Sequence, residues 1–209
     1  MRLILITNSD TVPDETVLVT TLFEHGLETL HLRKPGMSTA EMCNYINAIP
    51  AHFHSRIIIH SHHQLVLRFE LGGIHLTRVH RRRKLSNWIK LRWIKARRPS
   101  LIISASFHKL AQLYSEKGKY TYVLLGPLYD RQTKKFASGF NKVSLKTAIG
   151  KKNIPVIARG GIAAENAAEL REIGFGGIAI QNSFWNCDDP LQEFLNIVTQ
   201  LQSAGISIS

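Results

Sequence analysis

The chain has 209 residues, of which 44% are hydrophobic, and its 27 Lys and Arg outnumber its 15 Asp and Glu to give a net charge of +12. This length fits one large domain or two small ones. Because no run of about 18 apolar residues occurs, the sequence excludes an ordinary membrane-spanning helix. The apolar run before Asn8 is too short for a secretory signal, so we expect a buried strand there and a cytoplasmic protein.

Short apolar, β-branched runs recur at even spacing along the chain. They predict eight strands, at 2–7, 28–33, 56–60, 72–76, 101–106, 120–126, 154–160 and 176–180. The runs are almost continuously apolar, which is typical of parallel strands covered on both faces.

The intervals between these runs predict helices. The first, over 13–26, places Val17, Leu18, Leu22 and Leu27 on one side. The interval 61–71 leaves room for only a short helix. Residues 163–173 form another helix that ends at Gly174, and a last helix covers about 188–203.

Eight strand–helix units in about 200 residues predict a single compact (β/α)8 barrel, the TIM barrel, as one domain over residues 1–209. A doubly wound open sheet is the alternative. It would be expected to carry a G-x-G-x-x-G motif after the first strand, and the sequence has none there.

Active sites of such barrels form where the strands end. The positions after the predicted strands are rich in cations, hydroxyls, imidazoles and glycines and poor in carboxylates, which favours an anionic, phosphorylated ligand. The candidate substrate-binding and catalytic residues are His31, Arg33, Lys34, His60, Arg78, His80, Ser106, His108, Arg131, Thr133, Lys134, Gly160, Gly161, Gln181 and Asn182.

Two groups of these residues indicate phosphate binding. Gly160, Gly161 and Asn182 follow the last two strands, where backbone N–H groups often hold a phosphate; the alternative is that the glycines only make tight turns. Arg33 and Lys134, with Thr133, would suit a diphosphate, although the segment "TKK" is equally compatible with a solvated loop.

The charge is concentrated in one segment. Residues 78–98 contain ten Lys or Arg and no Asp or Glu. Leu85, Trp88, Ile89 and Trp93 share a helical face here, so we expect both tryptophans to pack on the barrel and the charges to form a solvated outer face. A nucleic-acid-binding surface is the alternative.

Histidines of the segment "HFHSRIIIHSHH" raise the question of a metal site. His52 and His54 precede a strand that His60 follows, so they would lie at opposite ends of the barrel. A site made of His60, His80 and His108 at one end is a hypothesis, and ordinary polar or ligand-contacting histidines are the alternative.

The order of these motifs resembles the thiamine phosphate synthase family from about residue 2 to 200. The resemblance rests on "HLRKPG" after strand two, "SFH" after strand five, "GPLYDRQTKK" after strand six, "GGI" after strand seven and the segment after strand eight. The segment "GPLYDRQTKK" is the most specific of these, and the others support the resemblance mainly through their order and spacing. The resemblance implies a (β/α)8 transferase of thiamine biosynthesis that joins hydroxymethylpyrimidine diphosphate to a thiazole phosphate and releases pyrophosphate, with Mg²⁺ on the diphosphate.

By position, the resemblance implies roles for particular residues. Arg33, Ser106 and Lys134 would act as catalytic residues on the pyrimidine diphosphate. The thiazole phosphate would be held by Thr133, Gly160, Gly161 and Asn182.

The sequence departs from the family at the expected magnesium ligands. The family has Asn-Asp after strand three and Gly-Gln-x-Asp after strand four, and its aspartates bind Mg²⁺. This chain has "HS" (60–61) and "TRVH" (77–80) there, so both aspartates are missing. His31 stands where the family has a glutamine, and Arg131 stands where it has a threonine. The family's lysine is expected at Pro35, and this chain has its lysine one position earlier, at Lys34. A thiazole tautomerase relative uses a histidine where this chain has Pro127; because proline cannot do acid–base chemistry, the sequence does not support that mechanism.

Three functions follow as hypotheses. The first is a synthase-like transferase in which Arg78 and its neighbours replace the metal. The second is a catalytically altered relative that binds or isomerises thiazole or pyrimidine phosphates. The third is a basic nucleic-acid-binding protein. The partners expected for the first two are small phosphorylated substrates, and the sequence leaves a homo-oligomer open.

Overall fold

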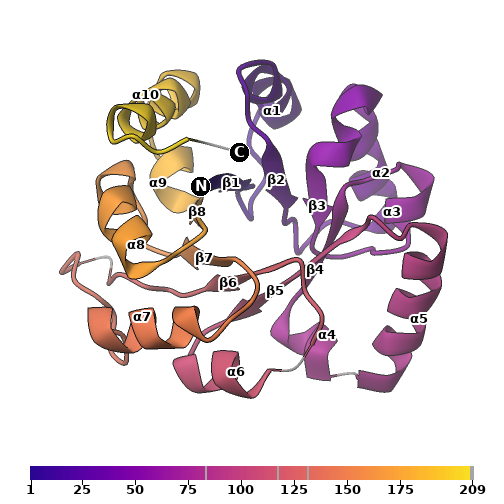
Figure 1. Ribbon diagram of the computed structural model, residues 1–209. Coiled ribbons are helices and arrows are strands. Elements are labelled where there is room, and N and C mark those ends of the chain that lie inside the picture. Colours follow the sequence, from indigo (N-terminus) through magenta and orange to yellow (C-terminus); the bar gives the residue numbers. More distant parts are fainter. Residues whose placement is uncertain (83, 117, 131, 208–209) are drawn as a thin grey trace.

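A computed structural model describes residues 1–82, 84–116, 118–130 and 132–207, with the backbone alone described for 82, 84–88 and 90. Eight parallel strands close into one barrel in chain order, and helices surround it (Figure 1). The strands are β1 (Arg2–Ile6), β2 (Thr29–Leu32), β3 (Ile57–Ile59), β4 (Gly73–Leu76), β5 (Ile102–Phe107), β6 (Tyr122–Leu125), β7 (Val156–Arg159) and β8 (Gly177–Ile180). The fold predicted from the sequence is confirmed.

Helices follow the strands on the outside of the barrel. They are α1 (Glu15–Glu24), α2 (Thr39–Asn47), η1 (Ala51–Arg56), α3 (Leu65–Arg68), α4 (Arg78–Arg82), α5 (Lys84–Arg97), α6 (Leu110–Ser115), α7 (Lys142–Gly150), η2 (Ala164–Asn166), α8 (Ala167–Ile173), α9 (Asn182–Trp185) and α10 (Pro190–Ser203). None of the described helices combines the length and apolarity that crossing a bilayer requires.

Local sequence explains where several helices begin and end. The Ser38 hydroxyl accepts from the Glu41 backbone N–H and the Glu41 carboxylate accepts from that of Ser38, so the two form a capping box at α2. Asp189 caps α10 in front of Pro190. The α8 helix ends at Gly174, whose φ of 109° suits glycine, as the sequence predicted.

The buried face of α1 differs from the predicted one. Val19, Leu22 and Phe23 are buried, whereas Val17 is 64% exposed. Spacings of three and four residues place the first three on one stripe, and Val17 falls outside it. The prediction was therefore right about the helix and wrong about Val17.

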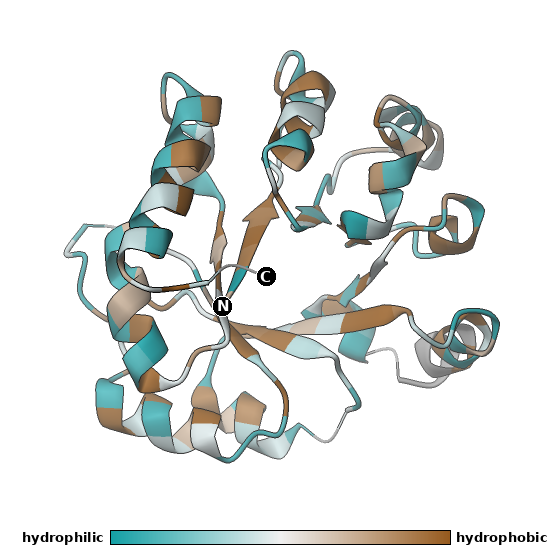
Figure 2. Ribbon diagram, turned by 45° about the horizontal axis from the view of Figure 1, so that its top comes forward, coloured by the Kyte–Doolittle hydropathy of each residue, from teal (hydrophilic) through white to brown (hydrophobic). Residues whose placement is uncertain are grey.

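Two apolar cores stabilise the barrel. The larger one lies between the strands and the helices. The smaller one fills one side of the barrel interior and consists of Ile4, Ile6, Tyr122, Leu124, Ile157 and Ala179. Figure 2 shows the strands as largely hydrophobic, with helices that combine hydrophobic and hydrophilic surface.

The strands β2, β4 and β5 alternate between apolar and polar residues. Leu30 and Leu32 of β2 belong to the outer core, and His31 between them does not. The same alternation sets His75 of β4 between Ile74 and Leu76. Because successive side chains of a strand point to opposite faces, these polar residues face the barrel interior. The expectation of almost continuously apolar strands overlooked this.

Candidate functional site

The carboxyl ends of the strands and the loops after them form one end of the barrel, which we call the mouth. Of the residues predicted from the sequence, His31, His60 and Ser106 lie close together here. They are joined by His75 and Arg159, which were not among the candidate site residues.

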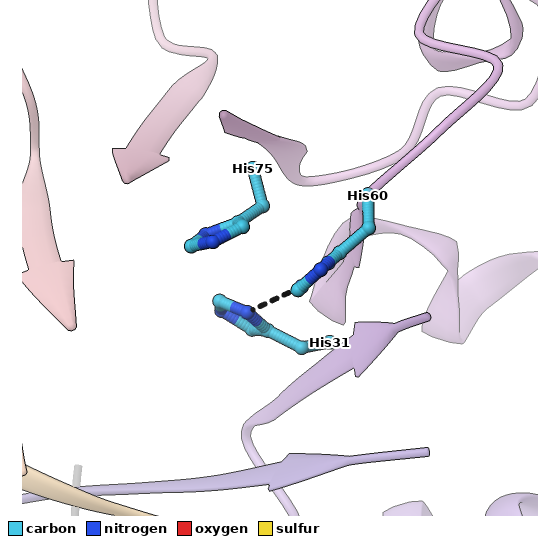
Figure 3. Close-up of side chains that lie close together, drawn as sticks. All are labelled: His31, His60 and His75. Atoms are coloured by element: carbon cyan, nitrogen blue, oxygen red, sulfur yellow. Dashed lines mark hydrogen bonds between the residues drawn. The ribbon is translucent and has the colours of Figure 1, made fainter. Parts of the chain in front are cut away.

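Three histidine side chains converge inside the mouth from β2, the end of β3 and β4 (Figure 3). His31 Nδ1 and His60 Nε2 are 3.0 Å apart in a hydrogen bond, and the rings of His60 and His75 stack with their centroids 4.1 Å apart. One ring nitrogen from each of the three lies within 4.8 Å of the other two. We call these residues the histidine cluster.

Hydroxyl groups from β5 and β6 bind the histidine cluster from the side. The two ring nitrogens of His75 lie 2.9 Å from Ser104 Oγ and 2.8 Å from Ser106 Oγ. The Tyr122 hydroxyl lies 2.6 Å from His31 Nε2. A hydrogen-bonded network therefore crosses the barrel interior and meets the smaller apolar core at Tyr122.

Burial keeps the histidine cluster uncharged. Burial, with a smaller contribution from the Arg159 charge, lowers the pKa of His31 to about 3. It also lowers the pKa values of His60 and His75 well below their ordinary value of 6.5, and the positive charge of neighbouring groups adds to this. A neutral imidazole has one N–H donor and one nitrogen lone pair. The cluster can therefore hydrogen-bond a polar ligand or coordinate a metal ion.

Two arginines reach the mouth beside the histidine cluster. Arg159, at the end of β7, donates from Nη1 to Ser106 Oγ at 3.3 Å. Arg33 donates from Nη1 to the Ser9 hydroxyl. Burial, and then the like charge of Arg33, lower the pKa of Arg159, so the two guanidinium groups are near enough to repel each other.

Neither guanidinium group is neutralised within the described part of the chain. The ion pairs found there join Lys34 to Glu15, Arg81 to Glu116 and Lys142 to Glu169. Two partly buried guanidinium groups that lack a carboxylate partner favour the binding of an anion such as a phosphate.

Lys34 has a different environment from Arg33. Its ammonium group binds the carboxylate of Glu15 at the start of α1 and the Asp10 carbonyl oxygen, the latter at 2.6 Å. The Lys34 and Glu15 side chains are 2% and 4% exposed. Burial raises the pKa of Glu15, although the Lys34 charge opposes this. The substrate contact predicted for Lys34 would require this buried pair to open and remains a prediction.

Thr133 and Lys134 lie on an exposed loop after β6. The Asp130 carboxylate accepts from the backbone N–H groups of Gln132 and Thr133, at 3.0 and 2.9 Å, and these bonds lower the pKa of Asp130. Asp130 thus holds the loop in shape and leaves the Lys134 side chain in solvent. Arg131, also predicted here, lies outside the described residues.

Gly160 and Gly161 form a tight turn after β7, with φ values of 81° and 70°. A Cβ on Gly160 would lie 2.6 Å from Pro127 Cα, and one on Gly161 would lie 2.7 Å from the Tyr129 carbonyl oxygen. Close packing against residues 126–129 therefore explains both glycines without a ligand. Their predicted role in phosphate binding is untested.

The remaining predicted residues surround the mouth more loosely. Arg78 and His108 are exposed at the start of α4 and after β5. His80 Nδ1 lies 3.0 Å from Thr77 Oγ1. Gln181 Nε2 donates to the Thr7 carbonyl oxygen at 3.0 Å, and Asn182 is exposed at the start of α9.

The hypothetical metal site of His60, His80 and His108 does not form. Within the described chain, His60 is grouped with His31 and His75 instead. The reason is that His75 points into the barrel from β4, whereas His80 and His108 lie beyond the strands. His54, as expected, lies before β3, where its ring bonds backbone carbonyl oxygens such as that of Ile49 at 2.9 Å.

His75 was missed, and Arg159, although it is at a predicted strand end, was given no role. His75 was missed because the candidates near its strand began at Arg78, beyond the strand. Its signature in the sequence is a polar residue at an inward position of an apolar run. Arg159 ends the run "IPVIARG", where a long charged side chain in a buried strand end is unusual and could have indicated a role.

Comparison with known proteins agrees with the resemblance found in the sequence. A family model described as thiamine monophosphate synthase matches residues 3–184. The thiamine-phosphate synthase of Bacillus licheniformis is 29% identical over 82% of this chain and 74% of its own length. That of Cronobacter sakazakii is 27% identical over 85% of this chain and 84% of its own.

Solved structures give the same result. Thiamine phosphate pyrophosphorylase from Bacteroides thetaiotaomicron superposes with a TM-score of 0.72 at 30% identity, covering 98% of both chains. The pyrophosphorylase from Pyrococcus furiosus superposes with a TM-score of 0.75 over 97% of this chain and 96% of its own, and at 20% identity it supports the fold alone.

Proposed function

Since this chain belongs to the thiamine monophosphate synthase family, we propose that it joins hydroxymethylpyrimidine diphosphate to a thiazole phosphate and releases pyrophosphate. The bond between the pyrimidine methylene carbon and the diphosphate oxygen breaks, and its electron pair leaves with pyrophosphate. The thiazole nitrogen then bonds to that carbon. Because neither step transfers a proton, the site needs positive charge, positioning and exclusion of water rather than a general base.

The observation that carries this proposal is the pair of guanidinium groups of Arg33 and Arg159. The leaving pyrophosphate gains negative charge, and charged donors that are already in place stabilise it. Ser106 Oγ, 3.3 Å from Arg159 Nη1, would bind a phosphate oxygen beside them. Lys134 would add a mobile charge from its exposed loop.

Magnesium, the metal expected from the family, finds a poor set of ligands in this chain. Mg²⁺ prefers carboxylate, carbonyl and water oxygens. Where the family has aspartates, this chain has Ser61 after β3 and His80 after β4. The Asp130 carboxylate already accepts two backbone hydrogen bonds. We therefore assign charge neutralisation to Arg33 and Arg159 rather than to a metal ion.

This assignment differs from the hypothesis drawn from the sequence, which gave the role to Arg78 and its neighbours. Arg78 is exposed, and Arg81 of the same helix is paired with Glu116. Arg159 is partly buried at the mouth itself. For the thiazole phosphate, we retain Thr133, Gly160, Gly161 and Asn182 as the proposed contacts.

A second function is favoured by the histidine cluster. His31 and His60 occupy positions where the family has a glutamine and an asparagine, and both magnesium aspartates are absent, so a site that binds the substrates without coupling them is the alternative. The chain would then be a relative that binds or isomerises thiazole or pyrimidine phosphates.

Assays with both phosphorylated substrates, in Mg²⁺ and in excess EDTA, separate the two functions. Thiamine phosphate is measured as fluorescent thiochrome after oxidation. We expect product under both conditions, because arginines replace the metal. Arg159→Ala should lower kcat by about 10²–10³-fold, whereas Arg97→Ala, an exposed arginine of α5, should have no effect.

Absence of product under both conditions would contradict the synthase function. If calorimetry then shows that each substrate binds, the second function is supported. Product formed only with Mg²⁺ would overturn the proposal that arginines replace the metal.

A further inference from the structure

We propose that the histidine cluster binds one divalent first-row transition metal ion, such as Zn²⁺ or Co²⁺, through His31, His60 and His75. This site concerns a different metal from the Mg²⁺ of the family and uses nitrogen ligands. It does not rest on the proposed transferase activity, because binding can be measured without substrates.

The spacing of the ring nitrogens is close to what such an ion requires. A tetrahedral Zn²⁺ with Zn–N bonds of about 2.0–2.1 Å holds its nitrogen ligands about 3.3 Å apart. His31 Nδ1 and His60 Nε2 already face each other at 3.0 Å. One ring nitrogen of His75 lies within 4.8 Å of a ring nitrogen of His31 and of His60, so a small rotation of the His75 ring would bring three nitrogens to one ion. Figure 3 shows the three rings pointing toward a common space.

The nitrogens not needed for the metal keep partners that orient the rings. When His31 binds through Nδ1, its Nε2 remains bonded to the Tyr122 hydroxyl at 2.6 Å. When His75 binds through one nitrogen, the other retains Ser104 or Ser106. Such outer partners fix the tautomer and orientation of histidine ligands. Three imidazoles leave the fourth position of a tetrahedral ion open.

The chemistry of the donors selects the class of metal. Neutral imidazole nitrogen binds zinc, cobalt, nickel and copper well and magnesium poorly. Arg159 opposes any cation here, since its guanidinium group shares Ser106 with His75. The outer partners are hydroxyls rather than carboxylates, so we expect affinity about 10–100-fold below that of a site supported by carboxylates.

A cobalt titration tests the proposal on untagged protein that has been treated with a chelator. Co²⁺ bound by three imidazoles in a tetrahedral site gives visible absorption bands that hexaaqua Co²⁺ lacks. We expect these bands to saturate at one ion per chain and to disappear when Zn²⁺ is added. Zn²⁺ should also raise the thermal unfolding temperature.

Variants locate the ion. His60→Gln and His75→Gln should each weaken Co²⁺ binding by at least about 10-fold, and Tyr122→Phe, which removes only a hydroxyl, should weaken it by about 10–100-fold. His25→Gln changes an exposed histidine directly after α1 and should leave Co²⁺ binding unchanged. Circular dichroism establishes that each variant is folded.

Absence of the bands in the unmodified chain would overturn the proposal, and the histidine cluster would then be a hydrogen-bonded network only. Bands that persist in both His60→Gln and His75→Gln would also overturn it, by placing the ion elsewhere. A failed transferase assay with normal cobalt bands would contradict the proposed function and leave the metal site intact.

Discussion

Neighbouring residues of one strand end have opposite roles in this chain. Arg33 reaches the mouth beside Arg159, whereas Lys34, the next residue, forms a buried ion pair with Glu15 at the start of α1. The sequence predicted a substrate contact for both. The alternation of side chains at a strand end separates them, so a cation after a strand is a candidate ligand only if its side chain faces the barrel axis.

The first residue-scale prediction concerns Lys34. Replacing it with Met should lower the free energy of unfolding by about 3–5 kcal/mol, because Glu15 then remains buried without a partner. The raised pKa of Glu15 eases this cost at low pH by allowing the carboxyl to protonate. Urea unfolding of the purified variant measures the change.

The double variant Lys34→Met/Glu15→Leu serves as the control. It removes both charges, so most of the lost stability should return. A Lys34→Met protein with normal stability and impaired substrate binding would contradict the structural role and restore the predicted substrate contact.

Among the elements, α5 is where sequence and structure disagree most. The sequence placed Trp93 and Ile89 against the barrel, but they are 51% and 56% exposed, and Ile94 is buried instead. The Arg97 guanidinium lies 3.6 Å above the Trp93 ring. A face of Leu85, Trp88 and Trp93 satisfies helical spacing as well as one containing Ile94, so periodicity did not decide between them. The side chain of Trp88 lies outside the described residues.

The exposure of Trp93 makes a test of nucleic-acid binding informative. Exposed aromatic rings among cations can stack on bases, yet Arg97 already covers one face of Trp93. We therefore expect α5 to be a charged outer surface whose binding to single-stranded DNA is weak and falls steeply with salt. Fluorescence anisotropy of a labelled oligonucleotide, measured from low to physiological salt, reports this affinity.

Trp93→Ala is the matched variant for that measurement. We expect it to change the affinity little, whereas loss of a stacking contact would cost about 1–3 kcal/mol. Tight binding at physiological salt that Trp93→Ala abolishes would favour the nucleic-acid function over the charged outer surface.

Across the whole molecule, the sequence predicted the strands better than the site. All eight strands were predicted, because buried parallel strands are the most strongly apolar segments of the chain. The site was predicted only in part. His31 of β2 and His75 of β4 are separated by β3, so their meeting depends on the register of both strand pairs, which spacing along the chain does not reveal. The partner of Lys34 likewise comes from another element.

The division of the barrel interior also determines how the fold responds to acid. One part is the smaller apolar core, and the other is the histidine cluster with Ser104, Ser106 and the nearby Arg159; Tyr122 belongs to the apolar core and bonds His31 through its hydroxyl. Because burial excludes protons from three imidazoles, protonation must couple to unfolding of the barrel as a whole.

We therefore predict a steep loss of stability below pH 6.5. There the unfolded chain binds protons at His31, His60 and His75 and the folded chain does not, since the folded pKa of His31 is about 3 and the other two are also lowered. The contribution of these histidines to the free energy of unfolding is thus fully present above pH 6.5. It is lost as the pH falls, by up to about 1.4 kcal/mol per pH unit for each histidine.

Urea unfolding in EDTA between pH 7.5 and 5 measures this slope. His31→Gln should reduce it by about a quarter, because His63, whose pKa burial lowers to about 4, contributes to the slope as well. His25→Gln, at an exposed position, should not reduce it. Unchanged stability across this range would mean that the histidine cluster accepts protons in the folded state.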